Sequence, residues 1–253
     1  MHMKKSGGEL TTRTDELQRV NDDLLKIQLS LLPKFGPNWP RHSLVGMKND
    51  ALARVLYYAE LYKQILQVPG VICEFGVQWG ATLAELINLR SIFEPFNHGR
   101  TIVGFDTFSG FVSIDEKDGS QSSPGDYSSA ENYEQTLEAI LRLHEKAAPY
   151  SHLTKFELIK GDASVTIDRW LEENPHAIVA MAIFDMDLYK PTADVLRKTL
   201  PRLTKGSLLV FDELNCKQFP GETVAVREVI GTHNLKLRRM PSQPFCSWAV
   251  WGE

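Results

Sequence analysis

The fold of this 253-residue chain is decided at residues 71–80, VICEFGVQWG. An apolar run that predicts a buried strand is followed by Gly76 and Gly80, and a helical pattern begins near Thr82. Glycine lets the backbone turn tightly and approach a ligand closely ahead of a helix N-terminus. The spacing of the two glycines is not the GxGxxG dinucleotide fingerprint. Their position after a strand and before a helix is what makes them indicate a ligand-binding turn.

Downstream of this stretch, apolar strands alternate with helical patterns. The strands that we expect are Val71–Phe75, Thr101–Asp106, Phe156–Lys160, Ile178–Phe184 and Ser207–Phe211. The helices that we expect lie near Thr82–Phe93, Asn132–Ala147, Ala163–Leu171, Thr192–Leu203 and Glu222–Gly231. This alternation predicts an α/β fold with a parallel sheet that helices cover on both faces.

The end of the chain has a different pattern. Leu235–Met240 and Phe245–Trp251 are strand-like runs separated by a segment with two prolines, which predicts an antiparallel hairpin. A mostly parallel, seven-stranded sheet that closes with such a hairpin is the layout of the class I methyltransferase fold, a Rossmann-like design.

The N-terminal part is predicted to be a helical extension, residues 1–67, ahead of the main domain at 68–253. A helix over Asp15–Leu32 carries an apolar seam, and a second helical pattern spans Asn49–Gln67. The seam consists of Leu17, Val20, Leu24, Ile27 and Leu31. It either covers its own domain or packs against a second copy, and we expect a homo-oligomer. The opening Met1-His2-Met3 resembles a tag remnant.

Composition excludes several classes of protein. A hydrophobic fraction of 43% and a charged fraction of 24% are those of a folded globular chain. A net charge of −4 argues against a nucleic-acid or anionic-membrane surface. The three cysteines lack metal spacing and are poor material for a disulfide framework. With no signal-peptide pattern or membrane-length apolar run, we expect a cytoplasmic protein.

Acidic residues lie at or just after the carboxyl ends of the expected strands, one strand after another. They are Glu74, Asp106, Asp162, Asp185 with Asp187, and Asp212 with Glu213. One such residue is usually a helix N-cap, but this repetition indicates a ligand site, because open parallel sheets bind ligands beyond the carboxyl ends of their strands. Asp106 is placed to accept bonds from ribose hydroxyls, and Gly161-Asp162-Ala163 to meet an adenine amino group.

The last strand ends suggest a metal. Asp187, Asp212 and Glu213 are hard oxygen ligands expected at neighbouring strand tips, which suits Mg²⁺ or Ca²⁺. Neither histidine nor cysteine accompanies them, which argues against zinc. The alternative is that Asp187 only caps the helix that follows. Residues 111–130, polar and glycine-containing, form a long insert after a strand end and are expected to be a mobile lid.

Several strings resemble the macrocin O-methyltransferase family. They are Glu74–Val77, Gly104–Phe108, Asp185–Thr192, Val210–Glu213 and Pro220–Val226, in the right order within residues 68–250. The resemblance implies S-adenosylmethionine as methyl donor, a divalent cation, and an acceptor hydroxyl on a sugar or related natural product. It also implies that Asp187 takes the acceptor's proton. Where family members commonly have two aspartates, this chain has Asp212-Glu213, so one ligand is longer.

The donor-binding residues expected on this basis lie at four strand ends. They are Glu74, Gly76, Gly80, Thr82, Asp106, Thr107, Ser109, Gly161, Asp162, Ala163 and Asp185. The alternatives are a phenol or catechol O-methyltransferase with the same cofactor and metal, a nicotinamide-dependent oxidoreductase, and a non-catalytic nucleotide-binding protein. The missing GxGxxG and the antiparallel ending count against the oxidoreductase.

The apolar seam leads to a test of assembly. Deleting residues 1–33 should lower the number of subunits, measured as molecular mass by light scattering. The physical reason is that exposed apolar seams rarely stay uncovered. A monomer both before and after the deletion would show that the helix covers its own domain.

Overall fold

The computed structural model describes residues 4–6, 9–11 and 13–253, so Met1-His2-Met3 lies outside the described residues. The chain divides into two compact units, Met1–Leu56 and Tyr57–Glu253. The division falls inside helix α3 (Asn49–Gln64), whereas the sequence placed it after residue 67. The buried tyrosines of α3, which start at Tyr57, belong to the second unit.

The first unit contains a short antiparallel strand pair, the long helix α1 (Asp15–Leu31) and the short helix α2 (Trp39–His42). In the strand pair, β1 (Lys4–Ser6) lies beside β2 (Glu9–Thr11). Thr14 caps α1 by accepting the N–H of Leu17. No residue of α1 is buried, and Leu17 and Ile27 of the seam are more than half exposed. Self-association through this seam stays a prediction.

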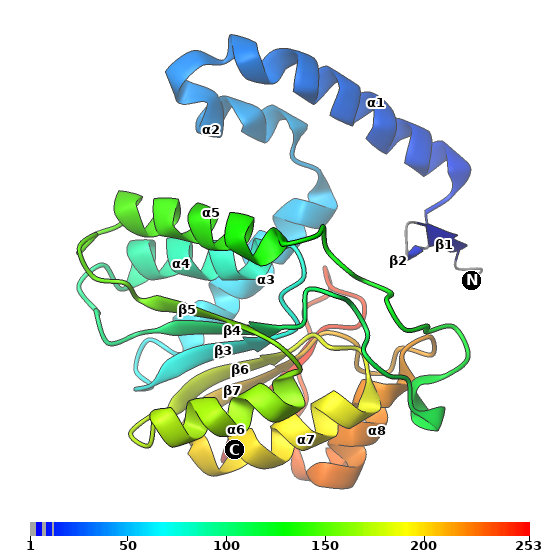
Figure 1. Cartoon of the computed structure of the whole chain (residues 1–253), viewed down its shortest axis with the longest axis vertical. Coiled ribbons are helices and arrows are strands. Elements are labelled where there is room, and N and C mark those ends of the chain that lie inside the picture. The colour runs from blue at the N-terminus through cyan, green and yellow to red at the C-terminus, as the bar shows by residue number, and fades with distance from the viewer. Residues whose placement is uncertain (1–3, 7–8, 12) are drawn as a thin grey trace. The chain divides into compact units, whose positions relative to one another are not determined.

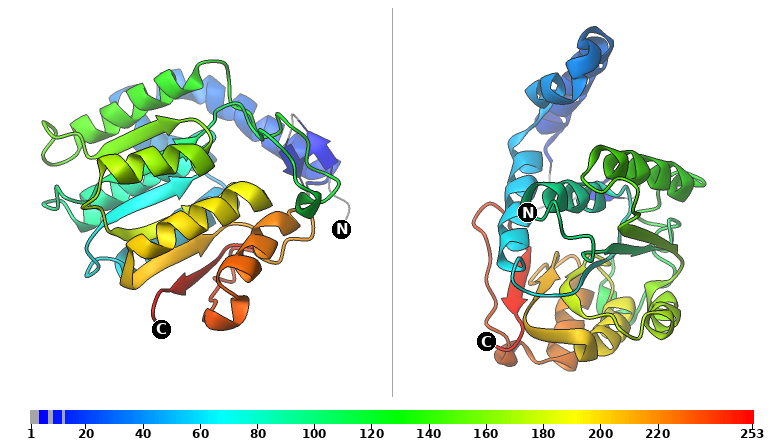
Figure 2. Two further views of the ribbon diagram at one scale, coloured as in Figure 1. Left: turned by 60° about the horizontal axis from the view of Figure 1, so that its bottom comes forward. Right: turned by 90° about the vertical axis from the view of Figure 1, so that its left-hand side faces the viewer.

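The second unit is an α/β fold, as the sequence predicted. Its sheet contains β3 (Val71–Phe75), β4 (Ile102–Asp106), β5 (Phe156–Lys160), β6 (Val179–Phe184), β7 (Leu203–Phe211) and β8 (Ser247–Val250). The strand order is β5-β4-β3-β6-β7-β8. All pairs are parallel except β7 with β8, which run antiparallel at the edge of the sheet (Figure 2).

The expected C-terminal hairpin is wrong in one strand. The sheet of the described part has six strands rather than seven, and Leu235–Met240 pairs with β8 only at Arg238 and Trp248. Leu235 packs with the core cluster on one face of the sheet, whereas Met240 packs with the cluster on the other. The segment therefore passes around the sheet edge and meets β8 at this one bridge instead of along a full strand.

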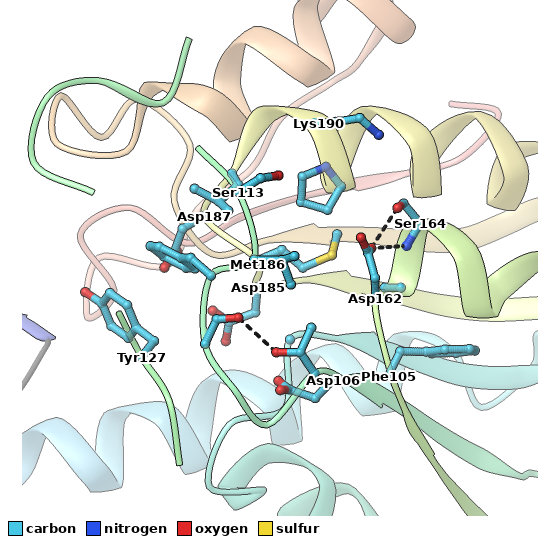
Figure 3. A pocket seen from close by; sticks show the side chains of 18 of the residues that line it. Phe105, Asp106, Ser113, Tyr127, Asp162, Ser164, Asp185, Met186, Asp187 and Lys190 are labelled. Atoms are coloured by element: carbon cyan, nitrogen blue, oxygen red, sulfur yellow. Dashed lines mark hydrogen bonds between the residues drawn. The ribbon is translucent and has the colours of Figure 1, made fainter. Parts of the chain in front are cut away.

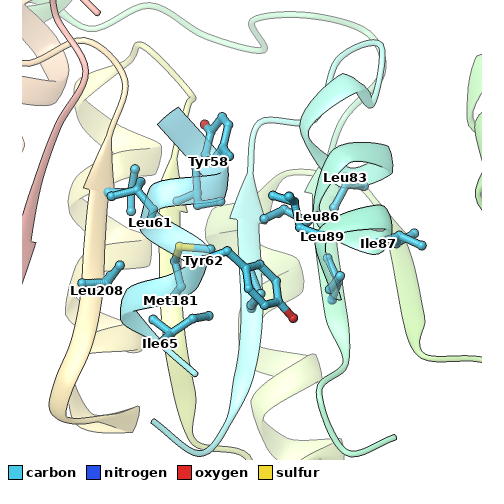
Figure 4. Close-up of a cluster of buried hydrophobic side chains, with 14 of the residues drawn as sticks. Tyr58, Leu61, Tyr62, Ile65, Leu83, Leu86, Ile87, Leu89, Met181 and Leu208 are labelled. Carbon is cyan, nitrogen blue, oxygen red and sulfur yellow. The ribbon is translucent and has the colours of Figure 1, made fainter. Parts of the chain in front are cut away.

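Two helical layers enclose the sheet (Figure 1). Helices α3, α4 (Ala81–Phe93) and α5 (Tyr133–Ala147) lie on one face, and α6 (Ala163–Glu173), α7 (Tyr189–Thr199) and α8 (Pro220–Val229) on the other. Side chains that alternate along each strand feed two apolar clusters. Figure 4 shows one of them, in which Leu61 of α3 and Leu86 of α4 meet Met181 of β6. Within the described residues, none of the helices is long and apolar enough to span a membrane.

A buried ion pair joins the loop before β4 to the end of α4. The Arg100 side chain, 2% exposed, donates through Nε and Nη2 to the two carboxylate oxygens of Glu94, at 2.9 and 3.1 Å. Arg100 also donates to the carbonyl oxygens of Ile65, Val68 and Gly70. Burial alone would raise the pKa of Glu94, but the hydrogen bonds from Arg100 and Tyr62 outweigh it and lower that pKa.

Breaking this pair should destabilise the second unit. Glu94→Gln leaves the Arg100 charge buried and unpaired, which should lower the free energy of unfolding by about 3–5 kcal/mol. The loss should be complete above about pH 4.3 and shrink at lower pH, because the wild-type carboxylate then takes up a proton as the pH falls through its lowered pKa. Denaturant unfolding at neutral and acidic pH measures both effects.

The matched control is Glu173→Gln, which breaks the exposed pair with Arg169 on α6. Exposed pairs contribute about 0–1 kcal/mol. Equal losses for the two variants would contradict a structural role for the buried pair.

Candidate active site

The main cavity lies at the carboxyl ends of the parallel strands. It has a volume of about 230 Å³ and is lined by residues that follow β3, β4, β5, β6 and β7. The chain runs outward through β3, β4 and β5 and then returns to place β6 on the other side of β3. Such a reversal in strand order opens a crevice beyond the strand ends. Figure 3 shows the acidic side chains of Asp106, Asp162, Asp185 and Asp187 around this space.

The turn after β3 approaches the end of β6 so closely that it requires glycine. Gly76 has a φ of +93°, and a Cβ at this position would collide with the carbonyl oxygen of Asp185. A φ in this range is strained for residues with a side chain. Gly76 therefore lets the β3 turn and the Asp185 segment form one wall of the cavity.

Asp106 holds the turn after β3 through the backbone. Its Oδ2 accepts the N–H groups of Val77 and Gln78 at 2.6 and 2.8 Å, and its Oδ1 accepts the N–H of Phe108 at 2.5 Å. A carboxylate offers about four acceptor sites. Asp106 thus has a structural function in the loop, and this leaves little of its acceptor capacity for a ligand.

Asp162 is an ordinary helix cap that also faces the cavity. Its Oδ1 accepts from the backbone N–H and the hydroxyl of Ser164, at 2.9 and 2.7 Å, and begins α6. The two functions are compatible, because one carboxylate oxygen makes both bonds (Figure 3).

Most of the residues expected from the sequence meet at this cavity. Those that line it are Gly76, Asp106, Thr107, Gly161, Asp162, Ala163, Asp185, Asp187, Asp212 and Glu213. Four others do not line it. Glu74 and Thr82 are buried in β3 and α4, Gly80 packs on Leu137, and Ser109 is exposed beyond β4.

Asp187 is a buried carboxylate of the cavity with a strongly perturbed pKa. It has a φ of +62°, is 8% exposed, and receives no hydrogen bond on its carboxylate from any described residue. Burial first, and then the charge of Glu213, raises the pKa of Asp187 well above its usual value. A buried carboxylate among like charges is stabilised by binding a proton or a nearby cation.

Glu222 lies behind these carboxylates and was not singled out from the sequence as a site residue. Its side chain is fully buried, and its Oε1 accepts the N–H of Glu213 at 3.0 Å. Burial raises the pKa of Glu222 well above its usual value. Glu222 therefore fixes the backbone of Glu213 at the edge of the cavity.

The carboxylates fit a hard cation by chemistry but are not arranged around one. In the part of the chain that the structure describes, no three His, Cys, Asp or Glu side chains form a group that could hold a metal ion. Asp212 accepts a bond from the Cys246 thiol at 3.0 Å. The donor set consists of charged oxygens, which Mg²⁺ prefers, but the side chains would have to rotate to surround it.

Part of the expected lid lines the cavity. Phe111, Val112, Ser113 and Tyr127 face it, and the rings of Phe111 and Tyr127 are 5.2 Å apart. Backbone bonds from Phe111 to Asp126 and from Gly125 to Phe111 close this loop at its base. These side chains, together with Met186 and Lys190, are lining residues that the sequence did not assign individually. The lid expectation and the Asp185–Thr192 string were the signals that pointed to them.

Comparisons with known proteins relate this cavity to an enzyme family. No model of a protein family and no curated protein matches the chain. The crystal structure of CalS11, a calicheamicin methyltransferase, is 35% identical in sequence with a TM-score of 0.89, and the match covers 96% of this chain and 95% of that one. The chain belongs to the class I O-methyltransferases.

A second CalS11 structure agrees with this assignment. In this structure CalS11 is a TDP-rhamnose 3'-O-methyltransferase of calicheamicin biosynthesis. It is 34% identical to this chain with a TM-score of 0.85, and the match covers 96% of this chain and 97% of that one. The O-methyltransferase NovP is 18% identical with a TM-score of 0.57 over 78% of this chain and 79% of that one, which shows the shared fold.

The bonds of Asp106 predict a local effect in this methyltransferase. Asp106→Ala removes the acceptor for three backbone N–H groups, so exchange of the Val77 and Gln78 amides should accelerate by roughly tenfold or more. Hydrogen exchange with mass spectrometry measures this. Asp162→Ala is the control, because it uncaps α6 at a neighbouring strand end. Unchanged exchange in residues 76–80 of Asp106→Ala would show that Asp106 does not hold the turn after β3.

Proposed function

We propose that this enzyme transfers a methyl group from S-adenosylmethionine to a hydroxyl of a nucleotide-linked deoxyhexose or of a glycosylated natural product. The observation that carries the proposal is the match to a TDP-rhamnose 3'-O-methyltransferase over nearly the whole of both chains. The resemblance to the macrocin O-methyltransferase family, with its Asp185–Thr192 and Pro220–Val226 strings, supports the same acceptor class.

The donor's nucleoside would lie along the ends of β4 and β5. Asp106 has about one of its four acceptor sites left beside its three backbone bonds, enough for one ribose hydroxyl, and Asp162 borders the cavity where a base would sit. S-adenosylmethionine supplies a methyl group on a sulfonium, so the protein contributes mainly alignment and exclusion of water. The cavity volume of about 230 Å³ is below the roughly 300–1,000 Å³ of most ligand pockets. Residues 111–130 would therefore move outward to admit both substrates.

Asp187 is the proposed proton acceptor. A sugar hydroxyl is a poor nucleophile while it holds its proton, and a base works best when its pKa lies near the working pH. While no cation is bound, burial and then the charge of Glu213 raise the pKa of Asp187, which makes it a better base than an exposed aspartate. A bound cation would lower that pKa again. Its position in the cavity beside the lid residues fits an acceptor bound under the lid.

Mg²⁺ is the proposed metal, with Asp187, Asp212 and Glu213 as the residues that would hold it. When bound, it would lower the pKa of an acceptor hydroxyl. The support is the crowding of like charges around Asp187, which a cation would relieve. The buried Glu222 carboxylate, which holds the backbone of Glu213, would keep one of these ligands in place.

An acceptor panel tests the proposed function. Wild-type protein with labelled S-adenosylmethionine and Mg²⁺ should methylate TDP-rhamnose or a related nucleotide-linked deoxyhexose and should leave catechol unmodified. Excess chelator should abolish transfer while S-adenosylhomocysteine binds nearly as before, because the proposed ribose and base contacts would lie at other strand ends. Asp187→Asn should have the same effect as the chelator, since it loses both the charge and the ability to take a proton.

Two outcomes would change the proposal. Full activity in chelator would leave a metal-free methyltransferase, and transfer to catechol alone would replace the sugar with a phenol. Asp168→Asn is the matched control, because Asp168 is an exposed aspartate of α6 that pairs with Lys198 away from the cavity. Binding of NAD in place of S-adenosylhomocysteine would contradict the donor.

A further inference from the structure

Tyr189, in the first turn of α7, is held by residues from two other segments. Asp118, in the 3₁₀ turn Glu116–Asp118 (η4), accepts the backbone N–H of Tyr189 at 2.5 Å. The Lys117 ammonium lies 3.8 Å from the centroid of the Tyr189 ring. The Tyr189 hydroxyl donates to Glu228 of α8 at 2.7 Å, and Lys117 donates to both Glu228 oxygens at 2.9 Å. We call Lys117, Asp118, Tyr189 and Glu228 the Tyr189 clasp.

Asp118 is buried and closely packed, so its bond to Tyr189 is not an incidental surface contact. It is 1% exposed, and a side chain at Gly221, in the first turn of α8, would collide with its carboxylate. Its other oxygen accepts the N–H of Asp115 at 2.7 Å and closes the η4 turn. Helix α7 has no cap of its own, since Leu188 at that position has no side-chain bond. Asp118 supplies the missing acceptor at the positive end of the helix.

The clasp lies next to Asp187. Asp187 precedes Tyr189 by two residues and has a φ of +62°, which a residue with a side chain rarely adopts. The tight turn is closed by the Leu188 N–H, which donates to the Met186 carbonyl at 2.6 Å. A strained conformation persists only where its surroundings fix it, and Asp118 fixes the residue that directly follows this turn.

The segment that contains Lys117 and Asp118 also lines the cavity. Residues 111–130 contain Phe111, Val112, Ser113 and Tyr127, which line it, as well as Lys117 and Asp118 of the clasp. Figure 1 shows the short green turn of this segment beside α8. Within the expected lid, residues 115–118 are therefore the docking point and not a freely moving tip.

We propose that Lys117 and Asp118 are positioning residues that couple closure of the lid to the orientation of Asp187, an inference that rests on the proposed role of Asp187 as proton acceptor. Docking of residues 115–118 on Tyr189 covers the acceptor pocket and fixes the Asp187 turn in one event. The acceptor's proton can then leave only when the pocket is closed to water, which is the usual benefit of induced fit.

Lys117→Ala is the sharpest test, because the Lys117 side chain touches the ring of Tyr189 and Glu228 but not the Asp187 turn itself. Hydrogen exchange should accelerate both in residues 111–130 and at the Leu188 amide. With TDP-rhamnose as acceptor, kcat should fall by roughly tenfold to a hundredfold, while the affinity for S-adenosylhomocysteine changes by less than about twofold. Asp118→Ala should have the same effects, and Asp118→Asn, which keeps an acceptor for the Tyr189 N–H, should be intermediate.

Two further variants separate positioning from simple anchoring. The double variant Lys117→Glu with Glu228→Lys restores the ion pair with its charges reversed, and we expect it to recover slow exchange and part of kcat. Arg197→Ala is the matched control, because Arg197 is an exposed cation of α7 that pairs within its own helix. Arg197→Ala should change neither the hydrogen exchange of the two segments nor kcat.

Faster exchange in residues 111–130 with an unchanged Leu188 amide would overturn the proposal, as would an unchanged kcat when both segments loosen. If the wild-type protein does not methylate TDP-rhamnose, the proposed acceptor fails on its own. The Leu188 amide of Lys117→Ala then still decides whether the lid and the Asp187 turn are coupled.

Discussion

The whole site depends on the contact between the turn after β3 and the end of β6. Strands β3 and β6 are neighbours although β4 and β5 lie between them in sequence, and the turn after β3 must pass against the Asp185 carbonyl with no side chain between. The reversal in strand order between β3 and β6 opens the crevice, and the close approach at Gly76 joins the two segments into one wall of it. Any larger residue at this position would push the two strand ends apart and separate the walls of the cavity.

Placing many carboxylates at one edge of a sheet is unfavourable, and the structure offsets this repulsion with backbone N–H groups. Asp106 accepts from the two turns beside it, Asp162 caps α6, and Asp118 caps α7 from a distance. Glu222 accepts from the backbone of the neighbouring strand end. Asp187 receives no such bond from the described residues, and burial raises its pKa. Groups with perturbed pKa values cluster at functional sites, which agrees with the proposed role of Asp187.

The insert after β4 connects parts of the molecule that are far apart in sequence. It leaves the strand end beside Asp106, lines the cavity with Phe111 and Tyr127, and reaches α7 and α8 through Lys117 and Asp118. The Asp185–Thr192 string thus serves two purposes. Its aspartates face the cavity, and its tyrosine contacts Lys117 and Asp118 of the insert. A single short segment can therefore join substrate enclosure to the geometry of the site.

The sequence by itself determined the alternation of strands and helices, and with it the edge at which Asp106, Asp162, Asp187 and Asp212 gather, because apolar periodicity and strand ends are local properties. Only the tertiary structure decided which partners these side chains have. Leu235–Met240 reads as a strand but passes around the sheet edge, since its two ends pack on opposite faces. Lys117 and Asp118 lie in the segment expected to be a mobile lid but dock on Tyr189, because a contact across 71 residues leaves no local pattern.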